Sequence, residues 1–96
     1  MNVVYIENDD ISKVLDKANG ITDLLVTDHL SAGSKQAIYF DAVIPAVVVG
    51  IYGDYIKRHG AVKFILPGVK TTVYAKYTSD PDEGLNGISY SVEVIL

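Results

Sequence analysis

The chain has 96 residues, of which 49% are hydrophobic, and it carries 8 basic and 12 acidic residues for a net charge of −4. This length supports one hydrophobic core and is too short for two, so we expect residues 1–96 to form a single domain. The absence of cysteine excludes disulfides, thiolate zinc sites, iron–sulfur clusters and cysteine nucleophiles, and it fits a reducing, cytoplasmic environment.

The sequence favours a soluble protein. The N-terminal residues show neither the basic segment nor the long apolar run of a secretory signal. The longest uncharged stretch, residues 42–53, is shorter than the roughly 20 residues that a helix needs to cross a bilayer. We therefore expect no membrane partner. A small domain this rich in apolar residues leaves apolar surface uncovered, which favours a homo-oligomer.

Charge is distributed unevenly along the chain. Residues 1–53 and 77–96 each carry a net charge of −4, whereas residues 54–76 carry +4. The positive charge of the central segment comes from Lys57, Arg58, Lys63, Lys70 and Lys76. The acidic total argues against a general nucleic-acid-binding protein, but this segment predicts a local contact with an anion.

The first part of the chain predicts alternating strands and helices. Residues 3–6 form a short β-rich run, and the polar residues 8–10 favour a helix start. Apolar residues then recur at helical spacing: Ile11, Val14, Leu15 and Ala18. We expect strands at 21–27 and 37–40, because both runs are short, apolar and rich in β-branched or aromatic residues.

Residues 42–60 contain a proline, two interior glycines and several valines, yet their apolar residues recur at helical spacing. The positions in register are Ile44, Val47, Val48, Ile51, Tyr52, Tyr55 and Ile56. We expect a helix over 43–58, with Asp41 as its N-cap and Gly60 at its end. A buried strand is the alternative, because glycine and valine both weaken a helix.

The last third predicts an antiparallel meander. Residues 61–66 and 69–78 are predicted strands joined by Pro67-Gly68, a pair typical of a type II turn, and residues 88–96 alternate again. The resulting order is β-α-β-β-α-β-β-β. It predicts an α+β two-layer sandwich, with a ferredoxin-like split βαβ core and an added C-terminal hairpin.

The segment GIYG at residues 50–53, followed by DYIKRHG and the β-like VKFIL, resembles the GxxG loop of KH domains. The resemblance covers about 20 residues and implies backbone between two helices that clamps nucleic-acid phosphates. KH loops usually place polar or basic residues between the glycines, whereas Ile51 and Tyr52 stand there in this chain. We therefore favour close helix packing at Gly50 and Gly53 over contact with RNA.

Few residues suggest catalysis or metal binding. Asp28-His29 and His59 are the histidine features, and no nucleophile motif accompanies them. The acidic clusters at 7–10 and 80–83 lack the spacing of a calcium loop. We therefore expect no catalytic residue, no metal site and no cofactor.

The favoured function is a small non-enzymatic protein interaction module that forms a homodimer or a larger oligomer. A helix that is apolar nearly all round should be covered on both sides, so self-association residues are predicted outside the core stripe of 43–58. They are Val43, Ala46, Val49, Gly50 and Gly53.

The first alternative is an acidic inhibitor, of the kind that viruses or mobile elements encode, that occludes a basic site on an unidentified target protein. Its predicted contact is an acidic loop with Asp80, Asp82 and Glu83. The second alternative is nucleic-acid binding through the basic segment 57–76. Strand alternation places Tyr74 on the same face as Lys70, Thr72 and Lys76, and aromatic and basic side chains together can bind single strands.

Overall fold

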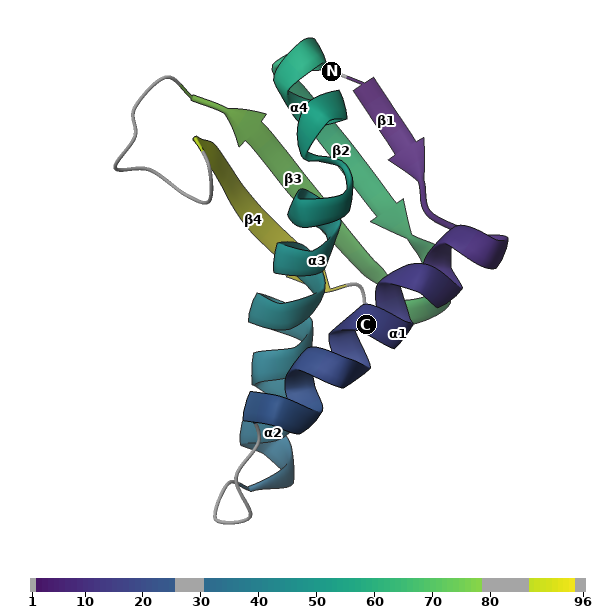
Figure 1. Ribbon diagram of the computed structural model, residues 1–96, viewed down its shortest axis with the longest axis vertical. Helices are drawn as coiled ribbons and strands as arrows, with labels where there is room; N and C mark the ends of the chain where they lie inside the picture. The colour runs from purple at the N-terminus through teal and green to yellow at the C-terminus, as the bar shows by residue number, and fades with distance from the viewer. Residues whose placement is uncertain (1, 26–30, 79–86, 95–96) are drawn as a thin grey trace.

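Four strands form one mixed sheet, and helices cover one of its faces (Figure 1). The computed structural model describes residues 2–25, 31–78 and 87–94. The strands lie across the sheet in the order β1 (Asn2–Tyr5), β2 (Ala61–Leu66), β3 (Thr71–Tyr77) and β4 (Ile88–Val94). β1 runs parallel to β2, and the other neighbours are antiparallel. The α+β class predicted from the sequence is confirmed, and the arrangement is compatible with a two-layer sandwich.

Among the described residues, all the α-helices and the π-helical turn lie between β1 and β2 in the sequence. They are α1 (Asn8–Leu25), α2 (Ala32–Ile38), the π-helical turn η1 (Tyr39–Val43), α3 (Ile44–Ile51) and α4 (Gly53–His59). The segments α2, η1 and α3 follow one another without a break and form one continuous helix, which we call the rod. Tyr52, at φ −103° and ψ 18°, separates the rod from α4. The expected helix over 43–58 is therefore confirmed, with one interruption.

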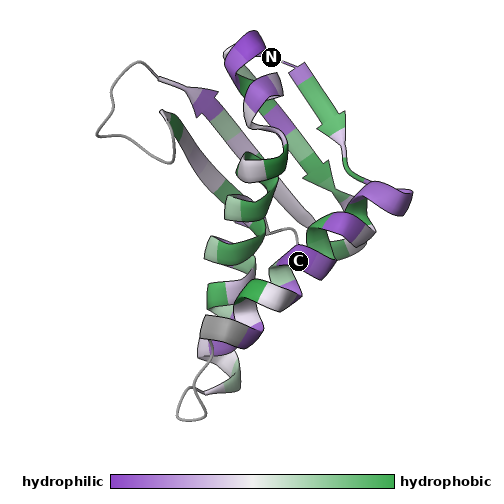
Figure 2. Cartoon of the chain, viewed as in Figure 1, coloured by the Kyte–Doolittle hydropathy of each residue, from purple (hydrophilic) through white to green (hydrophobic). Residues whose placement is uncertain are grey.

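The core lies between the inner face of the sheet and the helices. Alternation along the strands turns one set of side chains inward, and the buried members are Val62, Phe64, Leu66, Val73, Ala75 and Ile88. They form one cluster with buried residues of the helices: Val14, Ala18, Ile44, Val47, Val48 and Ile56. Figure 2 shows the same alternation along β2 and the apolar character of α3. The ring centres of Phe64 and Tyr52 are 5.2 Å apart.

The predicted strands at 21–27 and 37–40 are wrong. Residues 21–25 continue α1, because Gly20 does not take the positive φ that would end the helix. The Thr22 hydroxyl donates a hydrogen bond to the Ala18 carbonyl at 2.7 Å, as in a continuous helix. Residues 26–27 lie outside the described residues. Residues 37–40 belong to the rod, where tertiary packing overrides their β propensity.

The expected split βαβ core is also wrong. With these two strands replaced by helix, β1 and β2 are direct neighbours, and the helices form the crossover between them. Parallel neighbours require such a crossover, and β1 forms one edge of the sheet.

Two predicted details of local structure differ as well. Asp41 lies inside η1, and the N-cap of α2 is Ser31, whose Oγ accepts a hydrogen bond from the Ser34 N–H at 3.1 Å. The turn after β2 is a 3₁₀ helix (Pro67–Val69) rather than a type II turn at Gly68. Lys70 then takes the left-handed conformation, at φ 51° and ψ 41°. A lysine with its Cβ is strained there, whereas glycine would not be.

Candidate functional site

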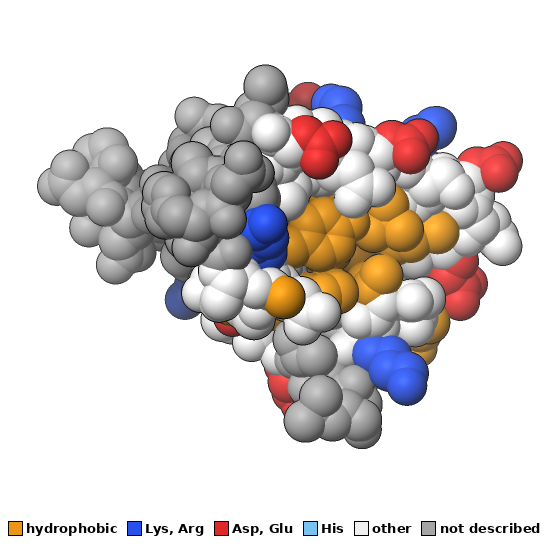
Figure 3. Space-filling view, turned by 90° about the horizontal axis from the view of Figure 1, so that it is seen from below, with side chains coloured by type: hydrophobic (Ala, Val, Ile, Leu, Met, Phe, Trp, Pro, Cys, Tyr) orange, Lys and Arg blue, Asp and Glu red, His pale blue; other side chains and the backbone are white. Residues whose placement is uncertain are grey.

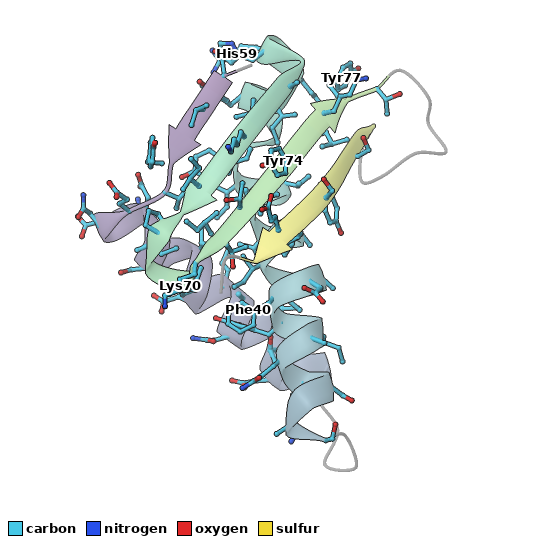
Figure 4. All side chains as sticks on the ribbon, turned by 180° about the vertical axis from the view of Figure 1, so that it is seen from behind. Phe40, His59, Lys70, Tyr74 and Tyr77 are labelled. Carbon is cyan, nitrogen blue, oxygen red and sulfur yellow. The ribbon has the colours of Figure 1, made fainter. Side chains whose placement is uncertain are left out.

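The two halves of the rod differ sharply in how well the chain covers them. α3 has five buried residues, whereas α2 has none. The transition falls in η1, where Val43 is buried but Tyr39 and Phe40 are half-buried. Figure 4 labels Phe40 beyond the lower end of the sheet, where the helices extend past the strands. The lower half of the rod therefore has no sheet beneath it.

Apolar side chains are exposed at this lower end. Figure 3, which views the molecule from below, shows hydrophobic side chains gathered in a hollow with acidic and basic side chains around it. We use the name basal patch for four apolar residues of α1, α2 and η1: Ile21, Ile38, Tyr39 and Phe40. Ile21 is 40% exposed, whereas the other three are half-buried and pack against the core. The rings of Tyr39 and Phe40 pack edge to face at 5.1 Å, and burial raises the pKa of Tyr39.

The rod is more apolar than its burial explains. Residues Ala32–Ile51 span 20 residues with a mean hydropathy of 1.3 over their most apolar stretch, yet only 33% of that stretch is buried. Among the described residues it is the one helix that is long and apolar enough to cross a membrane, a test that core helices of soluble proteins also pass. The uncharged stretch identified from the sequence covers only residues 42–53, whereas the helix also includes residues 32–41 and is therefore longer. The rod thus has apolar surface that one chain leaves uncovered.

The predicted self-association residues do not share one surface. Val43 is 4% exposed and Val49 is 3% exposed, so both belong to the core, and their predicted outward position is wrong. The rod packs against α1 as well as the sheet, and this burial on two sides takes up residues outside a single stripe. Ala46 and Gly53 are half-buried, and Gly50 is exposed.

The two glycines do not mark close packing within the described part of the chain. A Cβ at Gly50 would meet nothing within 4 Å, and one at Gly53 would make an ordinary contact of 4.0 Å with Ile88. The GIYG segment spans the junction of two helices, with Tyr52 alone between the end of α3 and the start of α4, and it borders a cavity of about 170 Å³. Asp54 and Lys57 both line that cavity, so their charges offset each other and the cavity carries no clear preference for a phosphate.

The five predicted anion contacts are spread over the molecule. Lys57 and Arg58 are exposed on α4, and Lys70 lies in the turn at the opposite end of the sheet (Figure 4). Lys63 and Lys76 lie on the outer face of the sheet, which no described helix covers. This pair shares the outer face with Tyr74, because the register sets Lys63 opposite Tyr74 and Lys76 lies two residues further along β3.

The outer face around Tyr74 has a defined geometry. The Lys63 Nζ lies 5.5 Å from the centre of the Tyr74 ring, a cation–π distance. The Tyr74 hydroxyl donates a hydrogen bond to the Glu93 Oε2 at 3.3 Å. A shallow depression of about 330 Å³ lies beside it, lined among others by Ala61, Lys76 and Ser89. The strand register confirms that Tyr74 shares this face with Thr72 and Lys76, whereas Lys70, predicted on the same face, lies in the turn before β3 and outside the strand.

The remaining sequence features assemble no reactive site in the described part of the chain. His59 is exposed and stacks beside Tyr55, with ring centres 4.2 Å apart. His29 lies outside the described residues, as does the acidic loop with Asp80, Asp82 and Glu83. Asp9 and Asp10 occupy the first turn of α1, where the helix dipole favours acidic residues. No group of three side chains suited to a metal ion occurs among the described residues.

Comparison of the chain with known protein families, curated protein sequences and solved structures gives no match.

Sequence reasoning missed the basal patch because it assigned Ile21 and residues 38–40 to strands. One signal in the sequence could have found it. Residues 36–53 contain a single charged residue, Asp41, and this stretch is long enough for five turns of helix. A continuous weakly charged stretch of this length favours one long helix over a strand and a separate helix.

Proposed function

We propose that the protein is a non-enzymatic interaction module that forms a homodimer through the basal patch and the lower half of the rod. The observation that carries this proposal is the incomplete burial of the rod, since one third of the residues in its most apolar stretch are buried and the others are half-buried or exposed. An apolar helix face at the surface of a small domain is a typical interaction site. A second copy supplies the missing cover with a chemically identical surface, as in most homo-oligomers.

The area needed for such an interface bears on which parts of the rod take part. A standard interface buries about 800 Å² per partner. Across its longest axis the whole molecule extends over 32 × 22 Å, a rectangle of about 700 Å², so the contact has to include the sides of the lower rod as well as its end. The charged residues around it are of both signs, with Lys35 on α2 and Asp23 on α1. A two-fold axis would allow such charges to meet across the contact.

A lipid bilayer is the other environment that covers an apolar helix. The upper half of the rod argues against it, because Ile44, Val47 and Val48 are already buried in the core of the domain. Insertion of the whole rod would remove these side chains from the sheet and would bring Asp41 into the bilayer. A second copy, in contrast, covers the lower half and leaves the core intact.

The experiment is sedimentation velocity over about 1–100 μM protein, a range that brackets micromolar dissociation constants. We expect a dimer for the parent protein and a folded monomer for Ile21→Glu, because Ile21 is exposed within one chain but would meet the partner. Ile51→Glu is the matched control: its side chain is 41% exposed, like the 40% of Ile21, but it lies at the upper end of the rod. This control should remain a dimer.

The outcomes separate the alternatives. A parent protein that stays monomeric over the whole concentration range would refute the proposal, as would a dimer that Ile51→Glu dissociates and Ile21→Glu does not. Flotation of the parent protein with lipid vesicles, abolished by Ile21→Glu, would assign the apolar surface to a membrane instead.

A further inference from the structure

The outer face of the sheet differs from the rest of the molecule in charge. Its charged side chains are Lys63, Lys76 and Glu93, which give a net charge of +1 in a chain whose total is −4. Glu93 is already engaged by the Tyr74 hydroxyl at 3.3 Å. Both lysines flank Tyr74, one across the strand pair and one two residues along β3. A negatively charged ligand would therefore find two cations beside an aromatic ring.

The same face provides a place for a flat group. The depression beside Tyr74 measures about 330 Å³, within the usual size of small ligand sites. Three small residues, Ala61, Ser89 and Ser91, line it and leave room next to the ring. An open face with an aromatic wall and flanking cations matches the two parts of a nucleotide, since the base can stack and the phosphate can pair with lysine.

We propose that the outer face of the sheet binds single-stranded nucleic acid, with a base stacked on Tyr74 and phosphates bound by Lys63 and Lys76. A duplex keeps its bases stacked on one another and cannot offer a free base to the ring. The charge of the face explains how a protein with an acidic total binds a polyanion at one place. This site lies on the sheet and is independent of dimerisation through the basal patch.

The test is fluorescence anisotropy with labelled 12-nucleotide oligo-dT and oligo-U and with a hairpin duplex, at about 50 mM salt and up to about 100 μM protein. We expect binding of both single strands and weaker binding of the duplex. Tyr74→Ala should weaken single-strand binding by about 5- to 150-fold. Tyr74→Phe keeps the ring and should stay within about threefold of the parent.

Lysine variants test the phosphate contacts and remain informative if Tyr74→Ala fails to fold. The double variant Lys63→Gln, Lys76→Gln should reduce the slope of log affinity against log salt by about 1.4, the value for two phosphate contacts on a single strand. The matched charge control is Lys13→Gln, Lys17→Gln, which removes two exposed lysines of α1. The matched aromatic control is Tyr77→Ala, which removes a tyrosine that is 42% exposed on the same strand but alternates to the other face. Both controls should bind like the parent.

Three results would overturn the proposal. The first is no detectable binding of either single strand under these conditions. The second is equal affinity for the duplex, which would show simple charge attraction without stacking. The third is equal loss of affinity in the control variants, which would place the contact elsewhere on the chain.

Discussion

Replacing Gly50 with alanine should stabilise the protein. Gly50 lies in α3, one residue before the end of that helix, and its backbone has no positive φ. A Cβ there would meet no atom within 4 Å, so the alanine methyl causes no clash within the chain. Glycine in a helix costs about 0.5–1 kcal/mol relative to alanine, mainly because the unfolded chain has more freedom to lose. We expect a gain in the free energy of unfolding of that size.

Thermal and urea unfolding followed by circular dichroism measure the gain. For a domain of this length, a change of 1 kcal/mol corresponds to a shift in Tm of about 4–8 °C, so Gly50→Ala should raise Tm by about 2–8 °C. Gly60→Ala is the matched control, because Gly60 ends α4 at φ 80° and an alanine is strained there. The same chemical change should lower Tm at that position.

A neutral or destabilising Gly50→Ala would refute this reasoning. It would mean that another surface, such as a second copy of the chain, approaches the backbone at Gly50 and that the glycine is required for close packing. Repeating the measurement at several protein concentrations separates the two cases, since a contact between chains makes Tm depend on concentration.

Three further predictions follow from particular residues. Lys70→Gly should raise the urea midpoint, with a gain of about 1 kcal/mol in the free energy of unfolding, because it relieves the left-handed conformation of Lys70. Phe64→Ala should lower that free energy by about 3–5 kcal/mol in the same assay, because Phe64 is fully buried and packs against the Tyr52 ring. Burial raises the pKa values of Tyr39 and Tyr52 above the ordinary 10.0, and Asp10 adds to the effect at Tyr52. As pH rises, the two tyrosines therefore lose their protons first in the unfolded chain. Their contribution to the free energy of unfolding is complete below pH 10 and is lost as pH rises above it. Urea midpoints between about pH 8 and 11 should show this loss, and replacing both tyrosines with phenylalanine should reduce it.

The C-terminal strands were predictable from the sequence because each alternates clearly. Val62, Phe64 and Leu66 face inward, and Lys63 between them faces outward, which is the period of a strand with one buried face. The runs at 21–27 and 37–40 were not predictable in the same way. A short apolar run fits a buried strand and a helix equally well, and only its packing against the rest of the chain decides between them.

The candidate sites depend even more on long-range packing. Alternation alone groups Tyr74 with Thr72 and Lys76, which the register confirms. It cannot bring Lys63 to the same ring, because that neighbour is set by the pairing of β2 with β3. Val43 and Val49 show the converse problem. The prediction of one stripe of core residues assumes that the helix is buried on one side. The rod packs against both α1 and the sheet, so residues outside that stripe are buried too.

The parallel pairing of β1 with β2 sets an order of events when the chain folds. The meander of β2, β3 and β4 pairs neighbouring segments, whereas 55 residues separate Tyr5 from Ala61. Closing so long a loop costs more entropy than closing a hairpin, so the meander can form before β1 joins it. During synthesis β1 is made first, but it can pair only after the helices and β2 have been made. The exposed side chains of Val3 and Tyr5, at 48% and 61%, thus belong to the strand that completes the sheet last.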